Sequence, residues 1–151
     1  MKRPTAAQQA RSAARLAAVQ ALYQAEMEAT PLPALLDEFH QHRLGATIED
    51  DEYAAADVAF FDDLVTGALA RKDEIDAAVA GRLASGWSLA RLDRTMLQIL
   101  RAGTYEILAR ADVPTGTAIS EYVDVAHAFF EPRDAKFVNG LLDAIAKQAR
   151  S

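Results

Sequence analysis

The sequence contains no cysteine. This absence excludes a disulfide scaffold, a zinc-thiolate site and a thiol nucleophile, and nothing in the composition indicates an oxidising compartment, so we expect a cytoplasmic protein. Long hydrophobic runs are also absent: the alanine run at 54–56 is far shorter than the roughly 20 apolar residues that a membrane helix needs. The N-terminus lacks the apolar core of a signal peptide. We therefore expect no membrane association.

Recognisable catalytic motifs are missing as well. There is no glycine-rich phosphate loop, no G-x-S-x-G motif and no H-E-x-x-H motif. His40 and His42 are two residues apart, which on a helix directs them to different faces, whereas a shared metal needs four-residue spacing. His127 lies among apolar residues, where a packed or surface histidine is more common than a general base. The sequence thus predicts no catalytic site, no metal site and no cofactor.

What the chain does have is a strong separation of charge. Residues 1–25 carry a net charge of +4, residues 26–76 carry −11 and residues 77–151 carry +1, within a total of −6. An acidic total argues against nucleic acid covering the whole surface. Because fields are screened over about 8–10 Å, a local basic end can still contact phosphates. The alternative interpretation is simply a solvated basic start of a helix.

Hydrophobic residues recur at spacings of three and four along almost the whole chain, which predicts helices. The predicted helices run from Thr5 to Glu28, from Leu32 to before Gly45, from Val58 to Leu69, from Ile75 to Ser85, from Leu92 to before Asp112, from Ile119 to Phe130, and from Phe137 to the C-terminus. No segment alternates with period two, so no strand is expected. With 151 residues, of which 51% are hydrophobic, we predict an all-α fold: a single compact domain, 1–151, of about seven helices in two small packed bundles.

Local signals refine these helices. Thr30 is the expected N-cap of the second helix, with Pro31 as its first residue, and the acidic stretch 49–52 suits the start of the third. The segment 115–117 is expected to form a turn and cap before the sixth helix. The spacing also predicts one shared apolar face on the first helix, formed by Leu16, Val19, Tyr23 and Met27. Glycines inside predicted helices indicate close helix crossings at Gly103 and Gly140.

Two groups of residues have the composition and spacing expected of a nucleic-acid-binding site. Arg11 and Arg15 are four residues apart on the first helix, so both can face one phosphate backbone. Arg133, Lys136 and Phe137 combine two cations with an aromatic ring after a proline, a mixture that suits a phosphate and an unstacked base of single-stranded RNA. The alternative is that Phe137 belongs to the core and the basic residues are only solvated.

Seven short motifs follow one another along the chain. They are A-R at 14–15, V-Q-A-L-Y at 19–23, I-L-R at 99–101, Y-E at 105–106, D-V-P at 112–114, I-S-E at 119–121 and K-F-V-N-G at 136–140. In these motifs and their order, the chain resembles the NusB family of bacterial transcription antitermination factors from about Arg11 to Ile145. The resemblance implies an all-helical protein of two small subdomains without catalytic activity. The implied partners are boxA-type single-stranded RNA, the ribosomal protein NusE and the RNA polymerase antitermination complex on ribosomal RNA operons.

The resemblance also implies RNA contacts at the start of the first helix and near the start of the last helix. These positions correspond to Arg11, Arg15, Arg133, Lys136 and Phe137, with Arg3 as a further basic residue near the N-terminus. Residues 12–14, between the two helix arginines, lack the denser arginine cluster of other members, and Arg133 replaces an acidic residue found in some of them. The resemblance does not decide whether this chain forms a homodimer, since some members of the family are dimers and others are monomers.

Three alternatives accompany this interpretation. A NusB-like domain of a ribosomal RNA cytosine methyltransferase would come with a catalytic cysteine and a cofactor-binding domain, and this sequence contains neither. A helical DNA-binding repressor needs a polar recognition helix, but the sixth predicted helix is mostly apolar. A helical interaction protein or oligomeric scaffold without an RNA role remains, with Tyr23 or Trp87 as association residues.

Overall fold

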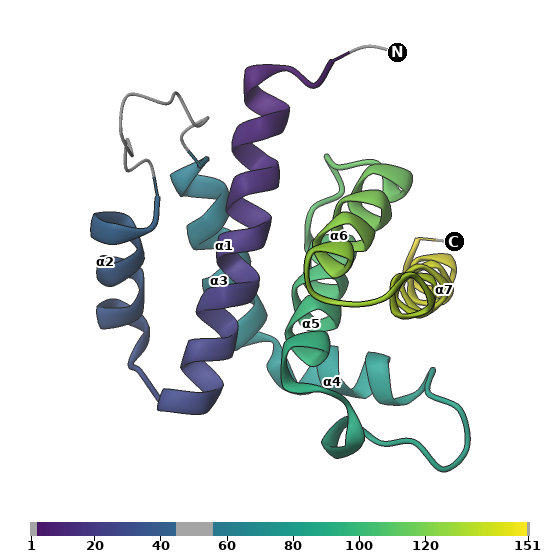
Figure 1. The fold of residues 1–151 in the computed structure, drawn as a ribbon. Coiled ribbons are helices and arrows are strands. Elements are labelled where there is room, and N and C mark those ends of the chain that lie inside the picture. Colours follow the sequence, from purple (N-terminus) through teal and green to yellow (C-terminus); the bar gives the residue numbers. More distant parts are fainter. Residues whose placement is uncertain (1–2, 45–55, 151) are drawn as a thin grey trace. The chain divides into compact units, whose positions relative to one another are not determined.

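The computed structural model describes residues 3–44 and 56–150, and these residues form an all-α fold (Figure 1). Seven α-helices and one short 3-10 helix, but no strand, occur among the described residues, which confirms the predicted fold class. The elements are α1 (Ala6–Glu28), α2 (Leu32–His42), α3 (Val58–Ala70), α4 (Lys72–Ala80), η1 (Leu89–Arg91), α5 (Arg94–Ala109), α6 (Thr115–Phe129) and α7 (Pro132–Ala149). No helix among them is long and apolar enough to cross a bilayer.

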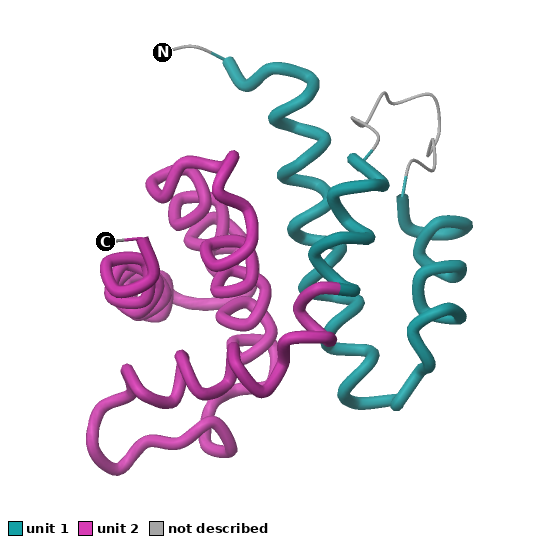
Figure 2. The backbone as a smooth tube through the Cα atoms, turned by 180° about the vertical axis from the view of Figure 1, so that it is seen from behind, with its two compact units in different colours: residues 1–66 teal, residues 67–151 magenta. Residues whose placement is uncertain are grey.

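The chain divides into two compact units (Figure 2). Unit 1 comprises residues 1–66 and contains α1, α2 and most of α3. Unit 2 comprises residues 67–151 and contains the end of α3 and all later elements. This division agrees with the two small bundles expected from the sequence, and each unit is described by itself.

Unit 1 is held together by an alanine-rich face of α1 and by aromatic side chains of α2 and α3. Ala14, Ala18 and Ala21 are fully buried, and α1 packs against α2. Phe39 and Phe61 stack with their ring centroids 5.5 Å apart. These contacts bury apolar area, which is the main stabilising contribution to such a small bundle.

The predicted apolar face of α1 is only partly correct. Val19 is buried and Leu16 is half-buried, but Tyr23 and Met27 are 39% and 53% exposed. The buried face is instead formed largely by alanines, because small side chains allow closer packing than the larger residues that define the periodicity.

The start of α2 also differs from the prediction. Pro31, not Thr30, is the N-cap, and Pro33 lies in the first helical turn. The Thr30 side chain instead accepts a hydrogen bond from Gln24 Nε2 over 3.4 Å. The acidic stretch 49–52, expected before the third helix, lies outside the described residues.

Helix α5 is the core of unit 2. Twelve of its 16 residues are buried, and it packs against α4, α6 and α7, as expected for the strongest hydrophobic ladder in the sequence. Two glycines give room for close contact. A Cβ at Gly103 would lie 2.9 Å from Leu142 Cδ1, and a Cβ at Gly67 would lie 2.0 Å from Tyr105 Cζ. The crossing predicted at Gly103 is confirmed, whereas Gly140 has nothing within 4 Å of its Cβ position, and that prediction is wrong.

Three helix boundaries in unit 2 were predicted incorrectly. Helix α7 begins at Pro132, not at Phe137, because proline is favourable in the first turn of a helix. Helix α4 ends at Ala80, not near Ser85. After the Gly81 N–H, which still donates to the Ala77 carbonyl, the N–H groups of Arg82 and Leu83 donate to carbonyls three residues back, so the α-helical pattern stops. Helix α6 begins at Thr115, with Pro114 as N-cap, so residues 115–117 form its first turn and no separate turn precedes it.

Charged side chains connect the elements of unit 2. Arg101 of α5 donates to both carboxylate oxygens of Asp76 of α4, over 2.8 and 3.0 Å. Arg150 donates to the backbone carbonyls of Ile107, Arg110 and Val113 over 2.8–2.9 Å. The last residues of the chain are thereby tied to the connection between α5 and α6. At the start of α4, the hydrogen bond from Arg71 to Glu74 raises the pKa of that arginine.

Candidate nucleic-acid interface

The first basic group lies at the beginning of α1. Thr5 and Gln8 form a capping box, in which the Gln8 N–H donates to Thr5 Oγ1 and the Thr5 N–H donates to Gln8 Oε1. This cap begins a helix whose first turn contains no acidic residue. Arg3 precedes it and is exposed. The helix N-terminus and the basic residues therefore contribute positive potential of the same sign.

Arg11 is the arginine of α1 that reaches the surface. Its side chain is 34% exposed, and its Nε atom lies 3.6 Å from Asp57 Oδ2. Its guanidinium carbon lies 4.4 Å from the centroid of the Phe60 ring. A guanidinium held in this way presents N–H groups in a fixed direction, and it retains enough exposure to meet a phosphate.

Arg15 occupies a different environment. Only 2% of the residue is exposed, and its guanidinium carbon lies 5.0 Å from the Phe60 centroid. The structure thus brings the two arginines together around one ring, with Arg11 partly exposed and Arg15 packed within unit 1. This burial favours a positioning role for Arg15 over direct phosphate contact.

Sequence reasoning did not include Asp57 and Phe60 in this site. Asp57 precedes α3, and its Oδ1 atom accepts a hydrogen bond from the Phe60 N–H over 2.9 Å, while its own N–H donates to the carbonyl of Ala10. Aspartate is favourable directly before a helix, so the position of Asp57 before α3 has a local reason. The contact with α1, however, depends on tertiary packing and leaves no local signal.

The second basic group lies on the first two turns of α7. Arg133, Lys136 and Phe137 occupy positions i, i+3 and i+4, so they share one helical face. Arg133 and Lys136 are exposed, and Phe137 is 38% exposed. Val138 and Leu141 are 0% and 6% exposed and belong to the buried side of the helix. Leu141 lies one turn beyond Phe137, so the Phe137 ring is at the border between the buried side and the exposed face.

The cap of α7 keeps this face in place. The carboxylate of Asp134 accepts a hydrogen bond from the backbone N–H of Glu131, and Pro132 occupies the first turn. These features begin the helix at Pro132 and thereby fix the positions of the side chains that follow. Two cations beside a half-exposed aromatic ring can bind a phosphate and stack on a base.

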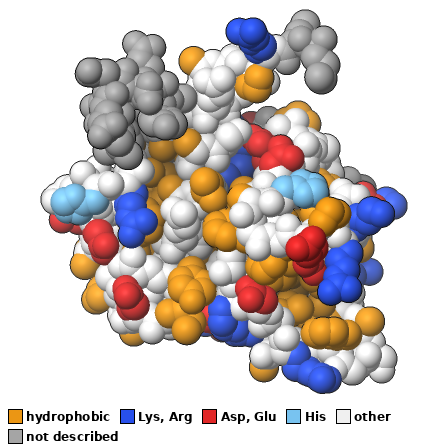
Figure 3. Space-filling model, viewed as in Figure 1, with side chains coloured by type: hydrophobic (Ala, Val, Ile, Leu, Met, Phe, Trp, Pro, Cys, Tyr) orange, Lys and Arg blue, Asp and Glu red, His pale blue; other side chains and the backbone are white. Residues whose placement is uncertain are grey.

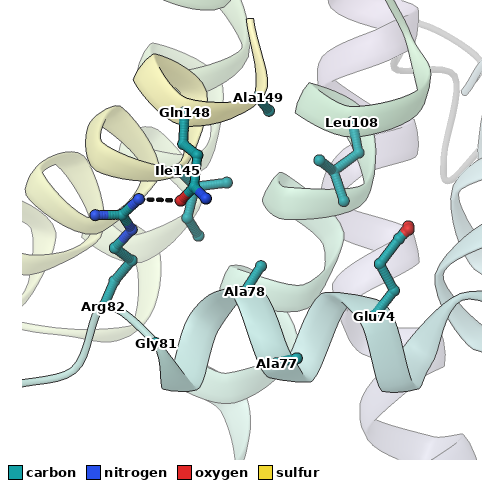
Figure 4. Close-up of a pocket in the computed structure, with 9 residues that line it drawn as sticks. All are labelled: Glu74, Ala77, Ala78, Gly81, Arg82, Leu108, Ile145, Gln148 and Ala149. Carbon is teal, nitrogen blue, oxygen red and sulfur yellow. Dashed lines mark hydrogen bonds between the residues drawn. The ribbon is translucent and has the colours of Figure 1, made fainter.

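A hollow of about 760 Å³ lies between α4, α5 and α7 (Figure 4). Alanines form much of its wall, and Arg82 donates a hydrogen bond to Gln148 across one end. It contains none of the residues that the sequence indicated for recognition. In the described ranges 3–44 and 56–150, no group of three or more histidine or carboxylate side chains could hold a metal ion.

The surface in Figure 3 carries acidic, basic and hydrophobic side chains in close alternation. No broad patch of one charge covers this face. Recognition of a polyanion at this face would consequently depend on a few placed cations more than on a strong general field.

The chain is similar in sequence and in fold to known proteins. The sequence model of the NusB family matches residues 12–147. Transcription antitermination protein NusB of Novosphingobium aromaticivorans is 76% identical over 141 residues, which cover 93% of this chain and 95% of the relative. Two solved structures share the fold. NusB of T. maritima has a TM-score of 0.76 at 30% identity, with coverage of 100% of this chain and 96% of that one.

The second structure contains the antitermination factors NusB and NusE in complex with dsRNA. Its matching chain has a TM-score of 0.76 at 25% identity, with coverage of 91% of this chain and 96% of that one. The family match extends over nearly the whole chain; it includes Arg15 and the basic group of α7 but begins after Arg3 and Arg11. The chain belongs to the NusB family.

Proposed function

We propose that this chain is a transcription antitermination factor that binds boxA-type RNA together with NusE. The observation that carries the proposal is the family match over residues 12–147, combined with the relative solved in complex with NusE and RNA. In this function the chain acts in the cytoplasm as a binding protein without catalytic activity. It joins the RNA polymerase antitermination complex and supports processive transcription of ribosomal RNA operons.

The proposed RNA contacts are the exposed basic residues of both groups and the aromatic ring on α7: Arg3, Arg11, Arg133, Lys136 and Phe137. Their exposure and charge support this assignment. Arg15 is assigned a supporting role, in which it packs against Phe60 and so holds the ring that orients Arg11.

NusE is expected to strengthen RNA binding. The chain carries a net charge of −6, and few of its cations are placed for phosphate contact. Because affinity for nucleic acid depends strongly on the number of neutralised phosphates, this chain alone should bind RNA weakly. A partner that adds cations and contact area increases the affinity without any change in this chain.

The test is a titration of four labelled nucleic acids: single-stranded boxA RNA, scrambled single-stranded RNA, duplex RNA and duplex DNA. Each is titrated with this chain, with NusE and with the mixture at fixed salt concentration. We expect the mixture to bind boxA RNA more tightly than either protein alone and more tightly than the scrambled strand. Equal affinity for all four nucleic acids would refute sequence recognition, and absence of binding by the mixture would favour the scaffold alternative.

A further inference from the structure

A groove beside the start of α7 contains more aromatic surface than the α7 face alone. The hollow measures about 480 Å³ and is lined by the segment from Leu83 to Met96 together with residues of α7 and the turn before it. Trp87 is 57% exposed and Phe137 is 38% exposed, whereas Met96 is buried. The groove thus has a buried apolar wall and two accessible rings.

Cations accompany these rings. The Arg91 guanidinium carbon lies 5.6 Å from the centroid of the Trp87 ring, and its Nη1 atom donates to the carbonyl of Gly86 over 2.6 Å. Arg133 also lines the groove and is exposed. The groove therefore presents one guanidinium fixed beside an indole and a second one exposed to solvent.

The two carboxylates of the groove are engaged in helix caps. Asp93 Oδ1 accepts hydrogen bonds from the N–H groups of Thr95 and Met96 over 2.8 and 3.1 Å. Asp134 Oδ2 accepts a hydrogen bond from the Glu131 N–H over 3.3 Å. Because backbone amides and the positive ends of two helices offset these negative charges, they weaken anion binding less than exposed carboxylates would.

We propose that this groove receives an unstacked nucleobase of the bound RNA, which stacks on Trp87, while Arg91 and Arg133 contact the adjoining phosphates. The inference rests on the proposed function and extends its RNA surface by Trp87 and Arg91. A base offers its π-face to an aromatic ring, and cations beside that ring attract the phosphates on either side of it. Phe137 and Arg133 belong both to the groove and to the proposed α7 surface, so the two are continuous.

Trp87 is the only tryptophan in the chain, so its fluorescence reports directly on this groove. The wild-type protein with NusE is titrated with boxA RNA and with a series of boxA RNAs that each carry one abasic nucleotide. We expect intact RNA to quench the fluorescence, and one abasic position to remove the quenching and weaken binding about tenfold. This measurement uses no protein variant and is therefore independent of any effect of substitution on folding.

Variants supply the second arm. Trp87→Ala is expected to weaken boxA binding about tenfold, Trp87→Phe less than that, and Arg91→Ala several-fold with a reduced salt slope. Arg82→Ala is the matched control, because Arg82 is an exposed arginine of the same unit that lines the other hollow. It should leave boxA affinity unchanged. Helical content by circular dichroism identifies any variant that fails to fold.

The possible failures are distinguishable. If wild-type protein with NusE binds boxA RNA but Trp87→Ala binds equally well and no quenching occurs, the inference is overturned and the proposed function stands. If NusE alone quenches Trp87 and Trp87→Ala weakens only NusE binding, the groove is a protein-binding site and the inference is again wrong. Absence of RNA binding by the wild-type mixture overturns the proposed function and this inference together.

Discussion

Tyr122 Oη donates a hydrogen bond to Glu106 Oε1 over 2.9 Å, and both residues are 0% exposed. The bond joins α6 to α5 within the core of unit 2. Burial of a carboxyl group is unfavourable for folding unless its oxygens are hydrogen-bonded. The hydrogen bond from the Tyr122 phenol therefore offsets part of the free-energy cost of burying Glu106. The pair links two helices by a directional contact in addition to apolar packing.

Removal of the phenol oxygen should therefore destabilise the protein. Tyr122→Phe leaves the ring in place but removes one donor to Glu106, and we expect a loss of about 1–3 kcal/mol in the free energy of unfolding. Urea denaturation measures this loss. Glu106→Gln is the matched control, because its amide oxygen can still accept the hydrogen bond. A Tyr122→Phe protein as stable as wild type would contradict an energetic role for the bond.

Two glycines in helices should respond oppositely to alanine. Gly67→Ala places a Cβ 2.0 Å from Tyr105 Cζ, and the resulting overpacking should cost about 1–3 kcal/mol. Gly140→Ala meets nothing within 4 Å, and alanine has the higher helix propensity, so it should stabilise the protein by up to about 1 kcal/mol. Thermal unfolding of both variants tests the prediction, and a change of the same sign in both would contradict it.

The arginines of α1 should separate RNA binding from folding. Arg11→Ala should reduce the salt slope of binding to single-stranded RNA by about 0.7, for boxA and scrambled RNA alike, with little loss of stability because Arg11 is partly exposed. Arg15→Ala removes a buried guanidinium from the Phe60 ring and should cost about 2 kcal/mol of stability. RNA titrations at several salt concentrations and urea unfolding measure the two effects. An unchanged salt slope for Arg11→Ala would remove that residue from the RNA surface.

Neighbouring residues on α7 offer a similar comparison. Phe137 is 38% exposed and Leu141 is 6% exposed. Leu141→Ala should cost about 2–5 kcal/mol of folding stability, as is typical of a buried leucine. Phe137→Ala should cost clearly less stability and should weaken RNA binding by about 1–3 kcal/mol. If Phe137→Ala unfolds as easily as Leu141→Ala and binds RNA normally while folded, Phe137 belongs to the core.

The sequence predicted the elements of this fold better than their ends or their packing. The ladder from Leu92 to Ile107 predicted α5, because a buried helix requires apolar residues on most of its faces. The ends of α4 and α6 were harder to predict, since Gly81 and Thr115 each suit either a helix or a turn. Exposure of Tyr23 could not be predicted either, because periodicity shows which residues share a face and not which face another helix covers.

The site shows the same limit. Arg11 and Arg15 have identical side chains at helical spacing, so sequence alone gives them one role, yet the structure exposes the first and buries the second. The difference arises from Phe60, some 45 residues later in the chain, whose contact with α1 depends on tertiary packing. For α7, the hydrophobic periodicity predicted a helix only from Phe137. In the structure Pro132 instead lies in the first turn, where a proline is favourable, so Arg133, Lys136 and Phe137 come to share one helical face.

The close approach of Tyr105 to Gly67 has an evolutionary consequence. The tyrosine ring occupies the space of the missing side chain, so neither position can change alone without steric conflict or an unfilled void. Substitutions at 67 and 105 are therefore expected to be epistatic: a larger residue at 67 should be accepted only where a smaller one stands at 105. Among relatives of this chain, the glycine and the large ring should be inherited together, as a single unit of selection within the core of unit 2.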